Sequence, residues 1–71
     1  MPKLFSSRHL VTVLLAHGFI FVSQKGSHGK FRKPGKPTLT VIVPMSRKEI
    51  PHGTFRSIVR QSQLSEPDFE K

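Results

Sequence analysis

The segment FIFVSQKGSHGKFRK, residues 19–33, predicts the hairpin around which the rest of the chain folds. Residues 19–25 begin with aromatic and β-branched side chains and then become polar, which is typical of a strand. The turn sequence GSHG follows, and a second strand is predicted from residue 28 to residue 33. Because side chains alternate along a strand, Phe31 is expected on one face of the sheet. The residues expected on the opposite face are His28, Lys30 and Arg32.

The sequence predicts a helix before this hairpin and a third strand after it. Ser6 and Ser7 can cap a helix that runs to His17, and Gly18 supplies its C-terminal stop. The apolar face expected for this helix contains Leu10, Val11, Leu14 and Leu15. The segment TLTVIVP, residues 38–44, is rich in β-branched residues and ends at a proline. The side chains expected to share one face of this strand are Leu39, Val41 and Val43.

Helices are also predicted after the third strand. Thr54 can cap a helix, and the buried stripe expected for it contains Phe55, Ile58, Val59 and Ser62. The segment SEPDF, residues 65–69, has an S-x-x-D pattern with proline in the first turn and predicts a brief terminal helix. The order favours an α+β fold of the αβββα type. A three-stranded antiparallel sheet would carry two helices on one face and leave its other face open to solvent.

Length and charge restrict the function. The 71 residues form one small domain, residues 1–71, with little room for a deep substrate pocket. The chain has 12 Lys and Arg residues against 4 acidic ones, which gives a formal net charge of +8. Such a surface attracts polyanions, so the expected partner is nucleic acid or an acidic protein surface.

The sequence predicts a cytoplasmic protein that makes no membrane contact. The apolar run at residues 10–16 follows basic residues, but it is short, has no cleavage site after it and leads directly into a strand. No segment approaches the roughly 18 apolar residues of a membrane span. The chain has no cysteine, which suits a reducing compartment.

The open face of the predicted sheet combines an aromatic ring with several cations. Alternation along the first strand places Phe21 on this face, beside the basic residues of the second strand. Cations that hold phosphates and a ring that stacks on an unpaired base are typical of single-stranded RNA binding. The alternative is that Phe21 is buried under a loop and that the cations are ordinary solvated surface.

His28 is a candidate general base, because an imidazole takes up and releases protons near neutral pH. RNA carries its own nucleophile, the 2′-hydroxyl group, so cleavage needs a base near that group and cations around the phosphate. Gly26 and Gly29 would let the backbone approach a phosphate, and Ser27 could donate a hydrogen bond to it. The alternatives for His28 are a phosphate donor and a turn residue with no chemical role.

Other enzyme classes fit the sequence less well. Ser27 and His28 are neighbours on an extended chain and point to opposite faces, so they do not form a nucleophile and base pair. The four histidines lack metal-ligand spacing, and the acidic residues are too few for a two-metal nuclease. We therefore expect no metal ion and no cofactor.

The sequence resembles the HicA toxins, also called YcfA-like mRNA interferases, of bacterial type II toxin–antitoxin systems. The two most specific motifs are QKGSH, at residues 24–28, and KEIPHGTFRSIVRQSQLS, at residues 48–65. The shorter matching pieces are GF at 18–19, FR at 31–32, VP at 43–44 and Phe69. These pieces follow the order and spacing of the family across nearly the whole chain.

The resemblance implies a double-stranded-RNA-binding-like fold and a metal-independent ribonuclease that cleaves mRNA, with His28 as the catalytic residue. It also implies a HicB antitoxin that covers the active site, so we expect a monomer when free and a heteromeric complex with the antitoxin. The residues that we expect to contact RNA are Lys25, Gly26, Ser27, Lys30, Arg32, Lys48, Gly53 and Thr54. The last two would act through backbone amides at a helix N-terminus.

Two positions depart from the family pattern. Gly29 stands where the family commonly has a second histidine, and Ser46 lies in the region after VP where another histidine often occurs. His28 would then act as a single base, with water or a lysine helping the leaving 5′-oxygen. The competing hypotheses are a non-catalytic RNA-binding module and a protein-interaction domain whose positive face binds an acidic partner.

Overall fold

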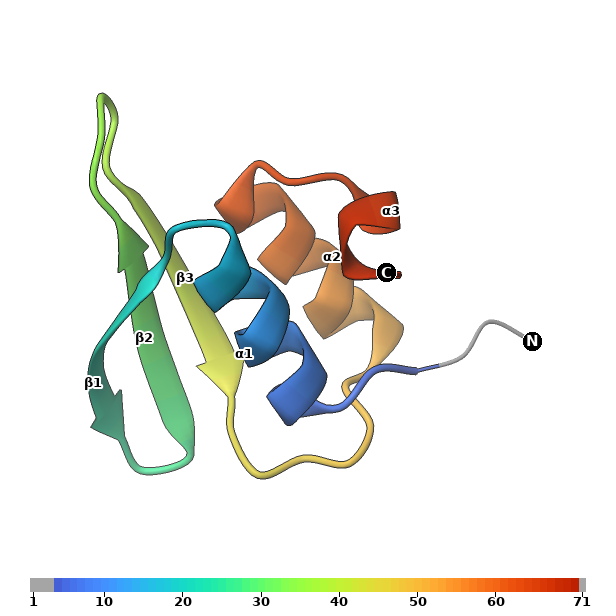
Figure 1. The fold of residues 1–71 in the computed structure, drawn as a ribbon. Helices are drawn as coiled ribbons and strands as arrows, with labels where there is room; N and C mark the ends of the chain where they lie inside the picture. The colour runs from blue at the N-terminus through green and yellow to red at the C-terminus, as the bar shows by residue number, and fades with distance from the viewer. Residues whose placement is uncertain (1–3, 71) are drawn as a thin grey trace.

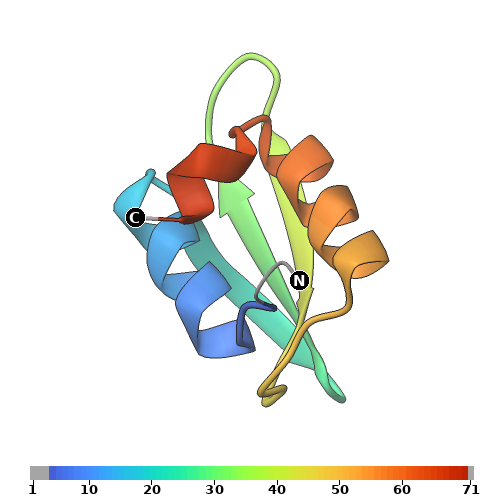
Figure 2. The same cartoon turned by 90° about the vertical axis from the view of Figure 1, so that its right-hand side faces the viewer.

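A computed structural model describes residues 4–70 and contains a three-stranded antiparallel sheet with helices on one face (Figure 1). The elements in chain order are α1 (Ser7–Ala16), β1 (Ile20–Lys25), β2 (His28–Lys33), β3 (Leu39–Pro44), α2 (His52–Ser62) and α3 (Glu66–Phe69). The helices α1 and α2 form one layer over the sheet, and α3 contacts α1 (Figure 2). The predicted α+β fold is confirmed, and its αβββα order agrees with a double-stranded-RNA-binding-like arrangement.

The sheet has β2 at its centre, antiparallel to both neighbours. Phe31 on β2 lies opposite Val41 on β3 and Phe21 on β1. The pairing of β1 with β2 shifts by one residue between Phe21 and Ser23, which marks a β-bulge. Because strand side chains alternate, an extra residue reverses the sheet face that every side chain beyond it occupies.

The hydrophobic core lies between the sheet and the helix layer. Its buried residues are Leu10, Val13, Leu14, Phe19, Phe31, Val41, Val43, Ile50, Phe55, Ile58 and Phe69. The stripes predicted for the third strand and the second long helix are confirmed. The stripe predicted for the first helix is wrong at Leu15, which is 50% exposed. Leu10, Val13 and Leu14 follow the i, i+3, i+4 spacing and face the core, and Leu15 falls outside that stripe.

The helix ends confirm two predicted caps and correct a third. Ser6 is the N-cap of α1, and its hydroxyl oxygen accepts a hydrogen bond from the backbone N–H of His9. Ser65 and Asp68 form the capping box of α3. The expectation that Thr54 caps the second helix is wrong, because α2 begins at His52 with Pro51 as its N-cap. The first turn closes on this proline, whose carbonyl accepts from the N–H of Phe55 at 2.9 Å.

Candidate nucleic-acid interface

His28 is the first residue of β2 and lies on the sheet face that points away from the helices. Its partners in the sheet are Lys25 on β1 and Pro44 on β3. The side chain is exposed, and none of the residues from 4 to 70 forms a hydrogen bond or ion pair with it. The imidazole is therefore accessible to a ligand on this face.

The cations predicted around His28 lie on the same face. Lys30 and Arg32 follow His28 at intervals of two residues, which spaces them by about 6.6 Å along the strand. Lys25 is directly opposite His28 across the hairpin. Phe31, between Lys30 and Arg32, is buried on the helix side, so the predicted division of β2 into two faces is confirmed. We call Lys25, His28, Lys30 and Arg32 the basic face.

The hairpin turn next to His28 consists of Gly26 and Ser27. Gly26 has a positive φ of 58°, a conformation that favours glycine, and its carbonyl accepts from the side-chain amide of Gln24 at 3.0 Å. The carbonyl of Ser27 accepts from the N–H of Met45 at 2.6 Å. The turn is thus tied to the end of β3, and His28 enters the sheet from a fixed position.

Phe21 does not belong to the basic face, and the prediction that it does is wrong. The bulge in β1 pairs Phe21 with Phe31 instead of Arg32, so it lies on the helix side of the sheet. The two rings are in edge contact, with centroids 5.6 Å apart. The same bulge brings Ile20 opposite Arg32, whereas Ser23, on the turn side of the bulge, keeps the regular hairpin register opposite Lys30. Nothing in the sequence marks this bulge, so the expectation from simple alternation fails here.

Gly29 is not placed as expected for a residue that lets the backbone come close to a phosphate. It is buried on the helix side, and a Cβ atom added to it would lie 2.9 Å from Sδ of Met45. The methionine side chain therefore fills the space that any side chain at position 29 would need. Gly29 keeps the backbone compact beneath Met45 and does not face a ligand on the basic face.

The remaining predicted contacts lie in the loop before α2 and in the first turn of α2, not on the basic face. Lys48 is in the loop between β3 and α2, whereas Gly53 and Thr54 belong to the first turn of α2. No side chain caps this helix end at its N-cap Pro51. The structure thus brings six of the expected RNA-site residues together around the hairpin and leaves these three separate. The grouped residues are Lys25, Gly26, Ser27, His28, Lys30 and Arg32.

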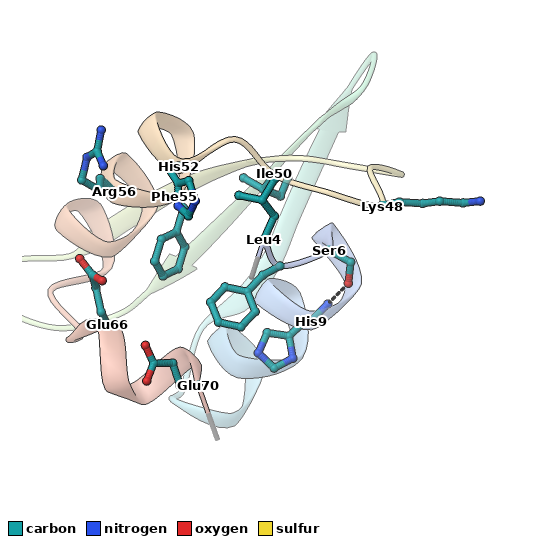
Figure 3. Close-up of a pocket in the computed structure, with 11 residues that line it drawn as sticks. Leu4, Ser6, His9, Lys48, Ile50, His52, Phe55, Arg56, Glu66 and Glu70 are labelled. Atoms are coloured by element: carbon teal, nitrogen blue, oxygen red, sulfur yellow. Dashed lines mark hydrogen bonds between the residues drawn. The ribbon is translucent and has the colours of Figure 1, made fainter. Parts of the chain in front are cut away.

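A cavity of about 980 Å³ lies between the start of α1, the start of α2 and α3 (Figure 3). Its apolar lining consists of Leu4, Phe5, Ile50 and Phe55. Phe5 stacks on His9 with centroids 4.8 Å apart, and Nε2 of His9 is hydrogen-bonded to the carbonyl of Phe69. His28 is not part of this cavity, so the candidate proton-transfer group is on an open surface. Sequence reasoning missed the cavity because its lining comes from segments far apart in the chain.

Neither a metal centre nor a membrane span is found among residues 4–70. No group of three or more His, Cys, Asp or Glu side chains in this range could hold a metal ion. No helix in the same range is long and apolar enough to cross a membrane.

The fold and the basic face define a small basic αβββα protein with an exposed histidine on its open sheet surface. The sequence matches the family model described as the HicA toxin of bacterial toxin–antitoxin systems, over residues 7–64. The chain belongs to this family, because the match covers most of its length. A search of curated proteins gives no significant match. Membership in the family implies a toxin role and, in general, an antitoxin partner.

Proposed function

We propose that this chain is a single-domain mRNA interferase, residues 1–71, that cleaves RNA in the cytoplasm with His28 as the general base. The observation that carries the proposal is the exposed imidazole of His28, unbonded among residues 4–70 and accompanied by three cations on one face. Family membership supports the toxin role. The reaction needs neither a metal ion nor another cofactor, because RNA contains its own nucleophile.

The proposed reaction begins when His28 takes the proton of a ribose 2′-hydroxyl group. The 2′-oxygen then attacks the adjacent phosphorus, and the bond from phosphorus to the 5′-oxygen of the next nucleotide breaks. Water or Lys25 gives a proton to the leaving 5′-oxygen. The products are a 2′,3′-cyclic phosphate and a free 5′-hydroxyl group. Lys25, Lys30 and Arg32 stabilise the negative charge on the phosphate oxygens as the new bond forms.

The turn and the start of α2 have separate tasks in this proposal. The short turn of Gly26 and Ser27 lets the RNA backbone come close to His28, and the Ser27 hydroxyl donates a hydrogen bond to phosphate. Lys48 and the amides of Gly53 and Thr54 bind a more distant part of the RNA backbone. In Figure 3 the Lys48 side chain extends away from the cavity, as a solvent-exposed phosphate contact would.

The antitoxin partner in this proposal is a protein of the HicB type. A net charge of +8 makes the free toxin a good target for an acidic inhibitor, because opposite charges accelerate association and select the partner. The toxin is monomeric when free and becomes part of a heteromeric complex when neutralised.

The direct test replaces His28. We expect His28→Ala to abolish RNA cleavage and growth arrest while folding and RNA affinity persist, because only the proton acceptor is removed. His28→Asn separates the two chemical roles of the imidazole, since an amide donates a hydrogen bond but is not a base. His17→Ala is the matched control, because His17 lies at the C-terminal end of α1 and outside the basic face.

Two results would contradict the assignment of His28. Undiminished cleavage by His28→Ala would remove this residue from the mechanism, and near-normal cleavage by His28→Asn would make it a hydrogen-bond donor only. Salt-sensitive binding of RNA that stays intact after long incubation with the wild-type protein would instead favour a non-catalytic binding module.

A further inference from the structure

Strand β1 presents apolar side chains to solvent on both of its faces. The exposed large apolar residues at this side of the molecule are Leu15 (50%), Ile20 (54%), Phe21 (53%) and Val22 (39%). Leu15 is in the last turn of α1, and the N–H of Phe19 bonds the carbonyl of Leu14 at 3.0 Å, which holds the start of β1 against the end of α1. We call these four residues the apolar edge.

The outer backbone edge of β1 is unpaired within residues 4–70. The strand order β1-β2-β3 leaves β1 at the edge of the sheet with one neighbour (Figure 1). Every residue of β1 is exposed. At the other edge of the sheet, α2 contacts β3. There the N–H of Ile42 on β3 donates to Oε1 of Gln61 on α2 at 3.1 Å.

The register shows which backbone groups of β1 point outward. Ile42 directs its N–H away from β2, so Lys30, its partner, directs its own backbone groups toward β1. Alternation along β2 then turns the backbone groups of Phe31 and Gly29 away from β1. Their partners Phe21 and Gln24 accordingly point their N–H and C=O groups toward solvent at the free edge. These groups are available to an added strand.

Proteins normally protect such an edge with charged residues, proline, a β-bulge or a covering loop. The stretch from Ile20 to Gln24 contains no charge and no proline, and its bulge is the only irregularity in this strand. Two cations border this stretch: Lys25 is at the end of β1, and Arg32 lies opposite Ile20. An apolar strand edge bordered by positive charge fits an apolar partner strand flanked by carboxylates.

We propose that the apolar edge is the docking site of the antitoxin, which adds a strand of its own to β1 and is acidic where it borders that strand. Two copies of this chain would each bring a charge of +8 to the contact, and this repulsion disfavours self-association. The inference rests on the proposed partnership with an antitoxin. The proposed docking site places the added strand beside the basic face. Strand addition next to His28 therefore inhibits RNA cleavage.

The test measures affinity between the purified chain and the antitoxin that is encoded with it. We expect Ile20→Asp and Leu15→Asp each to weaken the complex by about tenfold or more, because each removes apolar contact and adds repulsion. Gln63→Asp is the matched control. It adds the same charge at the C-cap of α2, outside the apolar edge, and Asp tolerates the left-handed conformation of that position (φ 60°).

Hydrogen exchange of the wild-type complex supplies a second measurement that does not depend on a variant. We expect the amides of Phe21 and Gln24 to become protected when the antitoxin binds. Antitoxin affinities for Ile20→Asp and Leu15→Asp within twofold of the Gln63→Asp value would overturn the proposal, as would unprotected edge amides. A concentration-dependent dimer of the free chain that Ile20→Asp abolishes would assign the edge to a second copy instead.

RNA cleavage by the same variants separates this inference from the proposed function. If docking is as proposed, Leu15→Asp, which lies on α1 and outside the basic face, keeps its cleavage activity and escapes inhibition by the antitoxin. A wild-type chain that binds the antitoxin through β1 but never cleaves RNA would contradict the proposed function and leave the docking site intact. Loss of RNA binding without loss of antitoxin affinity would assign the edge to RNA and overturn the docking proposal.

Discussion

At the scale of single residues, Gly29 and Met45 determine how β2 begins. A Cβ atom at position 29 would lie 2.9 Å from Sδ and 3.1 Å from Cγ of Met45, and 3.2 Å from Cε1 of Phe31. The backbone of Gly29 is not in the left-handed region, so space and not φ restricts this position. His28 therefore has a glycine as its neighbour on β2 because Met45 fills the place of a side chain.

Substitutions of Gly29 and Met45 test whether the methionine side chain restricts position 29. We expect Gly29→Val to lower the free energy of unfolding by about 1–3 kcal/mol, because its side chain overlaps Met45 and Phe31. Met45→Ala vacates part of that space, so the double variant should recover part of the loss. Urea denaturation of the wild type, both single variants and the double variant measures the coupling. Strict additivity of the two changes would show that Met45 does not restrict position 29.

At the scale of elements, one serine joins α1 to the end of β3. Ser7 is 3% exposed, and its hydroxyl donates to the carbonyl of Pro44 and accepts from the N–H of Arg47 at 3.0 Å. Its own N–H donates to the carbonyl of Arg47 at 2.9 Å. The segment that leaves β3 beside His28 is thus fixed to the first turn of α1.

The burial of Ser7 predicts that loss of its hydroxyl group destabilises the fold. We expect Ser7→Ala to lower the free energy of unfolding by about 1–3 kcal/mol, because it removes two hydrogen bonds of a buried hydroxyl, to the carbonyl of Pro44 and from the N–H of Arg47. Thr12→Ala is the control, since the Thr12 hydroxyl bonds the carbonyl of Arg8 on the exposed side of the same helix. Urea denaturation measures the free energy of unfolding of both variants. Equal stability of Ser7→Ala and Thr12→Ala would show that Ser7 does not anchor the segment.

The same elements show how far the sequence predicts this fold. Residues that alternate regularly, such as Phe31 between Lys30 and Arg32, are assigned to the correct faces because period two survives in β2. Phe21 is assigned to the wrong face because one extra residue in β1 reverses the alternation, and no residue type marks a bulge of this kind. Gly29 is misjudged for a related reason, since the long-range contact with Met45 depends on how the loop after β3 returns to the sheet.

At the scale of the whole molecule, the two faces of the sheet have different tasks. The helix face provides the core that a chain of 71 residues needs, and the open face carries His28 with its three cations. We propose the edge of β1 as the surface for a protein partner. In that proposal a small domain binds RNA and an antitoxin through adjoining surfaces, so that binding of one excludes the other.

We propose that His28 activates the 2′-hydroxyl group of RNA, and the chemical ends of the cleavage products distinguish this reaction from others. We expect the wild-type chain, incubated with RNA in excess chelator, to leave 2′,3′-cyclic phosphate and 5′-hydroxyl ends, and His28→Asn to leave the RNA intact. Fragments with 5′-phosphate ends, or cleavage that stops when the chelator is added, would contradict the account.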